Sequence, residues 1–435
     1  MTVRGGVGSA AIVVGTGVVA ALNFGKLPPA LLALQAEFGL SLVQVSWMVS
    51  LFMFAGALFG IAGGAIADGF GPRRVMAAGL LAMGSASAAG AMAGSPAVLF
   101  TSRAIESAGF LMAVLPGPAL LRQCVPAAQL RGWLGAWAAY MPAGMGLALV
   151  VTPWLMQAAG WRAAWWGTAI AGIGWAAMIA FALPRARQGA PAGPGMVSAT
   201  GSRSGAEAAA GPGRAPLAAN AWATATRIGP WLLALCFLFY AGQFVGIFSF
   251  LPSVYADAGV AQSLGALLTA LAVIANVAGN VGAGLLLQRG FQRHSLIAFA
   301  GVSMALCAWI AFGTEAPFAL RYAAIVVLSI VGGLIPGTLF ATAPFYAPSP
   351  AAVSTTVGLM QQGSASGQIL LPPVIAALAQ YSGGWSSTWI ATGVAAACTV
   401  AIAAAIRGHD RTRFARAVAA SASSGGAGGA SGGAG

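Results

Sequence analysis

The longest uncharged stretch of the chain constrains its fold more than any other feature. Residues 322–406 are 85 positions without an Asp, Glu, Lys or Arg, and further uncharged runs lie at 38–67, 75–102, 132–161, 228–256 and 258–288. A helix needs about 20 residues to cross the hydrocarbon core of a bilayer, so the longest stretch can hold three crossings. Only 6% of the residues are charged, whereas soluble domains carry about 25%. The chain is therefore predicted to be an all-α polytopic membrane protein.

The uncharged segments predict twelve transmembrane helices, six on each side of a segment rich in Gly, Ala, Pro and Ser. The expected spans are 10–35, 42–67, 75–94, 97–119, 132–156, 163–183, 229–252, 262–287, 295–313, 321–343, 354–379 and 387–406. We accordingly expect an N-terminal six-helix bundle at 1–183, a cytoplasmic linker at 184–228, a C-terminal six-helix bundle at 229–406 and a cytoplasmic region at 407–435.

The linker and the C-terminal region differ from the spans in composition. The linker holds five arginines and is predicted to be largely disordered, with room for one short surface helix near 217–227. Residues 407–420 are basic and are expected to form a helix on the inner membrane surface. From Ser421 onward the chain contains only Ser, Gly and Ala. This tail is expected to be disordered because it cannot bury a core.

The basic residues predict the orientation of the spans. Lys26 and Arg103 lie within spans, and Arg162 and Arg321 fall on the outer side. The remaining 16 of the 20 fall on one side of the predicted topology: Arg4, Arg73, Arg74, Arg122, Arg131, Arg185, Arg187, Arg203, Arg214, Arg227, Arg289, Arg293, Arg407, Arg411, Arg413 and Arg416. Basic residues concentrate in cytoplasmic loops, so both termini are expected inside the cell. The net charge of +13 then reflects orientation and not a nucleic-acid partner. The Arg-, Ala- and Gly-rich composition favours a bacterial inner membrane.

A charged turn between the second and third predicted spans occurs twice. The first copy, residues 64–74, contains Gly64, Asp68, Gly71, Arg73 and Arg74. The second copy, 220 positions later at 284–294, keeps a glycine and two arginines but has glutamine in place of the aspartate: Gly284, Gln288, Arg289 and Arg293. The offset is about half of the chain, which indicates two similar halves.

The first copy resembles the signature that joins spans two and three in the major facilitator superfamily, although Gly69 and Pro72 stand where that family commonly has basic residues. Residues 103–109 and 140–146 resemble two further family patterns in spans four and five. The resemblance implies two pseudo-symmetric six-helix bundles that transport a small solute by alternating access. It also implies a monomer, and a conformational latch formed by Gly64, Asp68, Gly71, Arg73, Arg74, Arg289 and Arg293.

Two roles are open for Asp68. At the end of a span, its carboxylate can cap the N-terminus of a neighbouring helix or pair with Arg73. The resemblance implies a contact with span eleven that holds the two halves together in the outward-facing state. The alternative is a topology anchor, because Arg73 and Arg74 alone satisfy the positive-inside rule.

Ionisable residues inside the spans are the main candidates for a substrate site. Lys26 is the only lysine, with Asn23 one turn earlier, and Arg103 and Glu106 share one face of span four. Counting along the helices brings Lys26 and Glu106 to similar depths, and the family's cavity is lined by spans one, four, seven and ten. Lys26 and Arg103 would then bind an anion, with Glu106 as a switchable partner or proton carrier. The alternative is an ion pair that only holds two spans together.

Uncharged polar residues within spans are secondary candidates. Tyr240 and Gln243 lie in span seven, and Gln243 is the preferred cavity residue because of its span. Asn280 and Gln361 are expected to form hydrogen bonds between helices instead. The remaining candidates are Asn276, Gln362 and Gln368.

These features together predict a secondary transporter of a small or organic anion, coupled to a gradient. A proton-coupled drug or metabolite exporter, with Glu106 as the proton carrier, is the alternative. A non-transporting membrane sensor is the alternative of another class. No phosphate-binding loop, metal motif or catalytic set occurs in the sequence. We therefore expect no enzymatic activity and no cofactor, and as partners only the solute, a coupling proton and membrane lipid.

Overall fold

The computed structural model describes residues 6–40, 42–183 and 217–427, and these ranges are helical without any β-strand. Nine helical stretches among them are long and apolar enough to cross a membrane. One stretch, 127–182, makes two passes, and α4 (Pro72–Ala91) and α14 (Val353–Ser382) are long enough to cross as well. The described residues thus form the twelve predicted spans. Most of the linker, 184–216, and residues 428–435 lie outside the described ranges.

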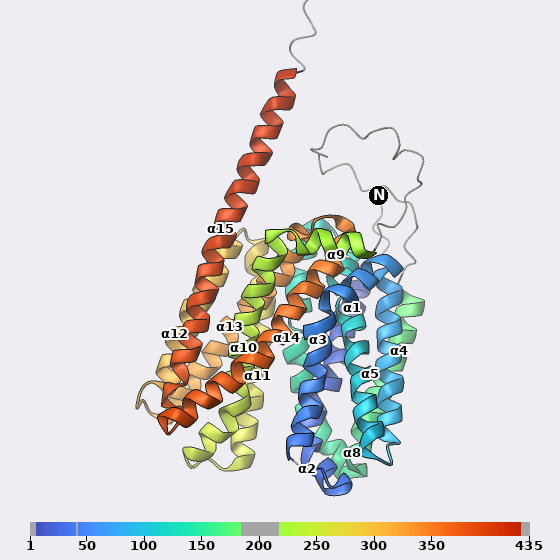
Figure 1. Ribbon diagram of the computed structural model, residues 1–435, viewed down its shortest axis with the longest axis vertical. Coiled ribbons are helices and arrows are strands. Elements are labelled where there is room, and N and C mark those ends of the chain that lie inside the picture. The colour runs from blue at the N-terminus through green and yellow to red at the C-terminus, as the bar shows by residue number, and fades with distance from the viewer. Residues whose placement is uncertain (1–5, 41, 184–216, 428–435) are drawn as a thin grey trace, which may run out of the picture.

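The first six spans form one half of the molecule (Figure 1). Its helices are α1 (Val7–Gly25), α2 (Leu27–Phe38), α3 (Leu42–Phe70), α4, α5 (Pro96–Val114), α6 (Gly117–Cys124), α7 (Ala127–Ala138) and α8 (Tyr140–Ala182). Spans one, four and five each consist of two consecutive helices. Within α8 the chain reverses at Gly160, whose φ of 72° is accessible to glycine at little cost.

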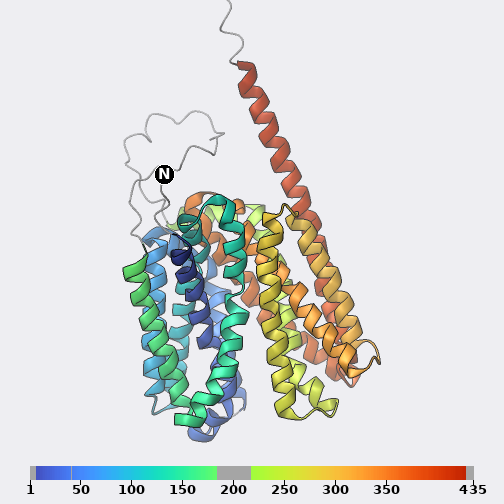
Figure 2. The same cartoon turned by 180° about the vertical axis from the view of Figure 1, so that it is seen from behind.

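The last six spans form the other half, beside the first in both views (Figures 1 and 2). Its helices are α10 (Ile228–Asp257), α11 (Gln262–Gln288), α12 (Arg293–Phe312), α13 (Phe318–Tyr346), α14 and α15 (Thr388–Ala427). The short α9 (Leu217–Ala225) lies across one end of the bundle, in the region where the sequence leaves room for a short surface helix.

Both ends of the described chain lie at the same end of the bundle, together with α9 (Figures 1 and 2). We call this end the terminal face and the opposite one the far face. The turn before α4, the end of α6 and the turn before α12 reach the terminal face, so Arg73, Arg122 and Arg293 lie there. Arg162 lies just after the α8 reversal, on the far face. The basic residues are therefore segregated as the topology predicts.

The C-terminal region differs from the expectation. The basic segment after residue 406 does not form a separate helix on the membrane surface, because α15 continues without a break to Ala427. Figures 1 and 2 show α15 projecting beyond the bundle from the terminal face. Residues 421–427, expected to be disordered, are part of this helix. No Pro follows the span, and the helix runs through Gly408 into the Ala-rich sequence beyond it.

Small residues bring the two halves into contact on the terminal-face side. A Cβ atom added to Gly60 of α3 would meet the backbone oxygen of Gly358 in α14, and one added to Gly64 would meet Ser354. In the second contact between the halves, Gly135 of α7 lies directly against Gly284 of α11. Gly60 and Gly64, four residues apart in α3, thus allow close helix packing between the halves, as small residues do in membrane helices.

Candidate functional site

Asp68 connects the two halves at the terminal face. Its carboxylate accepts hydrogen bonds from the backbone N–H groups of Ser354 (3.0 Å) and Thr355 (2.7 Å) and from the Thr355 hydroxyl (2.6 Å). These residues form the first turn of α14, whose N–H groups have no partner within the helix. A carboxylate there is stabilised by the hydrogen bonds and by the helix dipole. Of the two contacts open for Asp68, the structure shows the cap on span eleven.

The other residues of the first motif shape the same turn. Gly71 has a φ of 98°, a conformation that side chains disfavour, and Pro72 occupies the first turn of α4, where its missing N–H is harmless. Arg73 donates through Nε to the Ile179 carbonyl (3.3 Å) and through Nη2 to the Ala180 carbonyl (2.5 Å), at the end of α8. Arg74 is exposed.

The second motif makes a weaker version of this contact. Gln288 donates through Nε2 to the Gln129 carbonyl in the first turn of α7 (3.2 Å). In turn, Arg131 of α7 donates to the Leu287 carbonyl at the end of α11 (3.0 Å). The Gln288 amide carries no charge to interact with the helix dipole, so the charged partner at this junction is Arg131 and not the residue that replaces the aspartate. Arg293 lies 3.4 Å from Asp410, and Arg289 is exposed.

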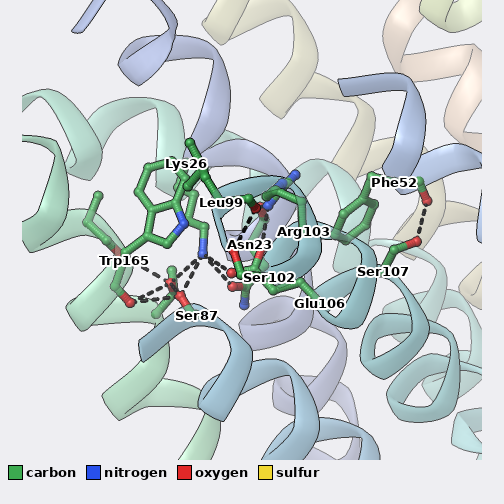
Figure 3. Close-up of polar contacts among 12 residues, drawn as sticks. Asn23, Lys26, Phe52, Ser87, Leu99, Ser102, Arg103, Glu106, Ser107 and Trp165 are labelled. Atoms are coloured by element: carbon green, nitrogen blue, oxygen red, sulfur yellow. Dashed lines mark hydrogen bonds and ion pairs between the residues drawn. The ribbon is translucent and has the colours of Figure 1, made fainter. Parts of the chain in front are cut away.

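The intramembrane charges form one fully buried cluster (Figure 3). Lys26 follows α1 at the point where Pro28 and Pro29 interrupt the hydrogen bonding of span one. Its Nζ lies 2.7 Å from Glu106 Oε1, and Arg103 Nη1 lies 2.5 Å from Glu106 Oε2. The counting argument that placed Lys26 and Glu106 at similar depths is thus correct. The cluster contains two cations and one carboxylate.

Uncharged polar groups surround Lys26. Its Nζ also lies within hydrogen-bond distance of Asn23 Oδ1 (2.9 Å), Ser87 Oγ (2.7 Å) and Thr168 Oγ1 (3.0 Å), which with Glu106 makes four acceptors for three N–H groups. The Ser87 hydroxyl lies 2.8 Å from both the Trp165 carbonyl and the Thr168 hydroxyl, so its hydrogen has alternative acceptors. Because a hydroxyl can donate or accept, this shell can satisfy Lys26 with or without its third ammonium proton.

Arg103 is less completely satisfied. Besides Glu106, it donates from Nη1 to the Asn23 carbonyl (2.9 Å), but its buried Nε and Nη2 atoms have no partner among the described residues. Its guanidinium carbon lies 4.9 Å from the centre of the Phe52 ring. A stacked arginine gains a cation–π interaction there, and Phe52 separates the charge from the central cavity.

A cavity of about 120 Å³ lies between the halves, and aromatic side chains dominate its lining. Eight rings form a continuous series with neighbouring centres 5.0–6.4 Å apart: Phe24, Phe52, Phe110, Tyr140, Phe340, Phe237, Tyr240 and Phe244. None of the described residues that line this cavity is Asp, Glu, Lys or Arg. Its polar groups include Asn276, Gln361, Gln368 and the Tyr140 hydroxyl, which accepts a hydrogen bond from Gln361 Nε2 (3.1 Å).

The predicted substrate residues therefore fall into three places. Asn23, Lys26, Arg103 and Glu106 come together, but in the buried cluster and not on the cavity wall. Tyr240 lines the cavity, where its hydroxyl accepts a hydrogen bond from Asn276 (3.1 Å). Gln243 is buried outside the lining, and its Nε2 has no partner among the described residues. Gln361 forms the expected hydrogen bond between helices, with Tyr140, and also lies on the cavity wall.

Sequence reasoning missed the aromatic lining. Phe237, Tyr240, Phe244 and Phe248 recur every three or four residues along span seven, which places them on one helix face. This periodicity was a usable signal, but a stripe of aromatic residues in a membrane helix equally fits packing against lipid. Only the structure shows that three of the four face the cavity.

Comparisons with known proteins agree with this architecture. The sequence is 36% identical over 87 residues to puromycin resistance protein pur8 of Streptomyces alboniger, a match that covers 20% of this chain and 17% of that protein. Among solved structures, the transporter FucP in its outward conformation superposes with a TM-score of 0.69 at 14% identity, covering 91% of this chain and 97% of FucP.

Two further structures share the fold. The proton:xylose symporter XylE has a TM-score of 0.68 at 14% identity, covering 91% of this chain and 93% of its own. The human organic anion transporter MFSD10 has a TM-score of 0.68 at 15% identity, covering 91% and 97%. The pattern that defines the Major Facilitator Superfamily matches residues 13–365 of this sequence. The chain therefore belongs to the Major Facilitator Superfamily of transporters.

Proposed function

We propose that this transporter exports aromatic organic compounds in exchange for protons. The observation that carries the proposal is the cavity wall, which contains eight neighbouring aromatic rings and no charged side chain among its described residues. Aromatic rings bind planar apolar groups and also organic cations, through the negative faces of their π systems. The segment shared with a puromycin resistance protein supports a solute of this class.

A drug-sized solute needs more space than the present cavity provides. Small-molecule sites usually enclose about 300–1,000 Å³, against about 120 Å³ here. Binding would therefore require the aromatic side chains to rotate or the halves to separate on the far-face side. The hydrogen bonds that Asp68 accepts and that Arg131 and Gln288 donate hold the halves together on the terminal-face side. They leave the halves free to separate on the far-face side.

We assign the coupling proton to Lys26 and not to Glu106. Each carboxylate oxygen of Glu106 accepts a hydrogen bond from a cation, Lys26 or Arg103. A charged lysine or arginine has no lone pair and cannot accept a hydrogen bond. The O–H of a protonated Glu106 would therefore face a second donor, and both buried cations would lose their counter-charge. Loss of a proton from Lys26 instead leaves a neutral cluster, and either the Ser87 or the Thr168 hydroxyl can donate to the single lone pair of the amine.

This assignment couples the proton to a cationic solute. With Lys26 protonated, the cluster carries one net positive charge behind the Phe52 ring, which repels a cation in the cavity. With Lys26 neutral, the repulsion disappears and the rings can hold the cation. Proton and solute would thus alternate, with the solute released toward the far face as Lys26 takes up a proton.

The segregation of basic residues to the terminal face supports a cytoplasmic location for that face and for both termini. We accordingly place the protein in a bacterial inner membrane. Export of the solute then runs from the terminal face to the far face, and protons move in the opposite direction.

Transport of an organic anion is the second candidate. It is favoured by the two unpartnered buried nitrogen atoms of Arg103, which could bind an anionic group if the Phe52 ring moved aside. The structure favours this candidate less than the sequence does, because no cation lies on the cavity wall among the described residues.

Flux into proteoliposomes tests both candidates. Purified protein would be given puromycin, a fluorescent aromatic cation and a panel of small anions, with and without an imposed pH gradient. We expect gradient-driven flux of the aromatic compounds. Anion flux without aromatic flux would refute the export proposal and favour the second candidate.

Two variants of Lys26 test the proton assignment. Lys26→Met removes the charge, and Lys26→Arg keeps a charge that cannot be lost. In Lys26→Met we expect exchange of labelled for unlabelled solute to continue while gradient-driven flux is lost. Lys26→Arg should lose both. Gradient-driven flux that persists in Lys26→Met but disappears in Glu106→Gln would contradict the assignment and identify Glu106 as the carrier.

A further inference from the structure

A second cavity lies at the terminal face, apart from the central one. It has a volume of about 670 Å³ and is formed by the turn between α11 and α12, the end of α13, the extended part of α15 and one residue of α7, Arg131. The turn contains Gly290, whose φ is 90°. The transport proposal assigns no role to this cavity.

The cavity is strongly basic. Four arginines line it, Arg131, Arg293, Arg407 and Arg411, against a single carboxylate, Asp410. Asp410 accepts a hydrogen bond from the Tyr346 hydroxyl (2.8 Å) and lies 3.4 Å from Arg293 Nε. It can therefore neutralise only one arginine, and the lining keeps an excess of three positive charges with its histidine neutral.

Two of the arginines are held in place by aromatic contacts. The guanidinium carbons of Arg131 and Arg293 lie 5.8 and 5.7 Å from the centre of the Phe345 ring. Arg131 is fixed further by its bond to the Leu287 carbonyl. The buried Nη1 of Arg293 has no partner among the described residues. Because Arg293 is also the first residue of α12, the unpaired N–H groups at that helix end add to the positive field.

We propose that this cavity binds the phosphate group of an anionic phospholipid from the leaflet at the terminal face. Arginine binds phosphate oxygens through paired N–H groups, and basic pockets between transmembrane helices are suited to anionic headgroups. A soluble phosphate compound offers the same chemistry. The lipid is favoured because the exposed rings of Phe291 and Phe414 stand at the cavity, and the exposed apolar side chains Phe299 and Val302 continue along α12.

The bound phosphate would also connect the two halves. Arg131 belongs to the N-terminal half, whereas Arg293, Arg407 and Arg411 belong to the C-terminal half. A phosphate that contacts arginines of both halves binds best when the terminal face is closed, as it is in this structure. The lipid would then favour the arrangement that is open toward the far face.

Thermal unfolding of the full-length protein in nanodiscs tests the inference. The nanodiscs contain phosphatidylcholine alone or with increasing phosphatidylglycerol, and unmodified protein is compared with Arg407→Gln/Arg411→Gln. Both arginines are exposed, so their loss should not prevent folding, which the Tm in phosphatidylcholine verifies. The matched control is Arg227→Gln, an exposed arginine of the same face outside the cavity.

We expect phosphatidylglycerol to raise Tm with a saturable dependence in the unmodified protein and in Arg227→Gln. In the double variant the apparent affinity for phosphatidylglycerol should fall about tenfold or more, since each basic residue near an anionic surface contributes about 1 kcal/mol. An equal rise of Tm in the double variant, an equal loss in Arg227→Gln, or no rise at all would overturn the proposal. If inorganic phosphate in detergent raises Tm with a saturable dependence and phosphatidylglycerol adds nothing to this rise, the ligand is a soluble phosphate and the lipid proposal is wrong.

Discussion

The charges of the buried cluster should differ in how much stability the protein loses when each is removed. Glu106→Gln leaves Lys26 and Arg103 as two cations without a counter-charge in a site with no solvent exposure. Removing one partner of a buried ion pair costs about 3–5 kcal/mol. Lys26→Met instead leaves the Arg103–Glu106 pair intact at 2.5 Å. Ser87 keeps its bond to the Trp165 carbonyl, so we expect a loss of only about 1–3 kcal/mol.

The double variant separates this reasoning from a general loss of packing. In Lys26→Met/Glu106→Gln a single cation, Arg103, remains, so the double variant should be more stable than Glu106→Gln alone. Independent effects would instead add and make it the least stable of the three. The difference in stability between Glu106→Gln and the double variant should also shrink as the pH rises. Loss of the Lys26 proton removes the same unopposed charge that Lys26→Met removes.

Denaturant unfolding of the purified protein in detergent, followed by tryptophan fluorescence, provides the ranking. Unfolding midpoints would be compared for the unmodified protein, both single variants and the double variant over a range of pH. Additive losses, or a Lys26→Met variant less stable than Glu106→Gln, would refute the reasoning about the charges in the cluster. Either result would also remove the basis for assigning the coupling proton to Lys26.

Three further outcomes follow from the contacts described. Asp68→Asn removes the charge that accepts the hydrogen bonds of Ser354 and Thr355. It should therefore destabilise the closed terminal face by about 2–3 kcal/mol. Distances between spin labels across that face should lengthen, and unchanged distances would exclude a latch. Gly60→Val places a Cβ against the Gly358 oxygen and should shift the same distances, whereas Gly174→Val, with open space around its Cβ, should not. Phe244→Ala should reduce the affinity for an aromatic solute about tenfold through lost ring contacts, as measured by fluorescence quenching. Its Tm should change by no more than a few degrees. Retained affinity would contradict the cavity as the binding site.

Most of the fold could be predicted because the spans are encoded locally. An uncharged run of about 20 residues has few alternatives to a membrane helix, and the boundaries predicted for span two, 42–67, and span eight, 262–287, agree closely with α3 and α11. The exception is the end of span twelve. The change from apolar to basic sequence near residue 406 marks where the chain is expected to leave the membrane, but a change of solvent does not by itself end a helix.

The candidate site was only partly predictable. Lys26 and Glu106 could be expected at one depth because rise per residue fixes height along a helix. Which way they face depends on how six helices rotate against one another, and Phe52 comes between the charges and the cavity. Gln361 forms the expected hydrogen bond between helices, with Tyr140. That it also lines the cavity could not be predicted, because the sequence does not show which way a side chain in a membrane helix faces.

The sequence alone determined the number of spans, their segregated basic residues and the two related halves, because these depend on length, hydropathy and charge counted along one chain. It also placed Asp68 at the end of a span, and the structure showed that its carboxylate caps α14. Only the tertiary structure decided that the charges of spans one and four pair with one another away from the cavity, that aromatic rings from both halves form the cavity wall, and that arginines distant in sequence gather in one basic cavity. Such groupings arise from contacts between helices, and no single helix carries the information that specifies them.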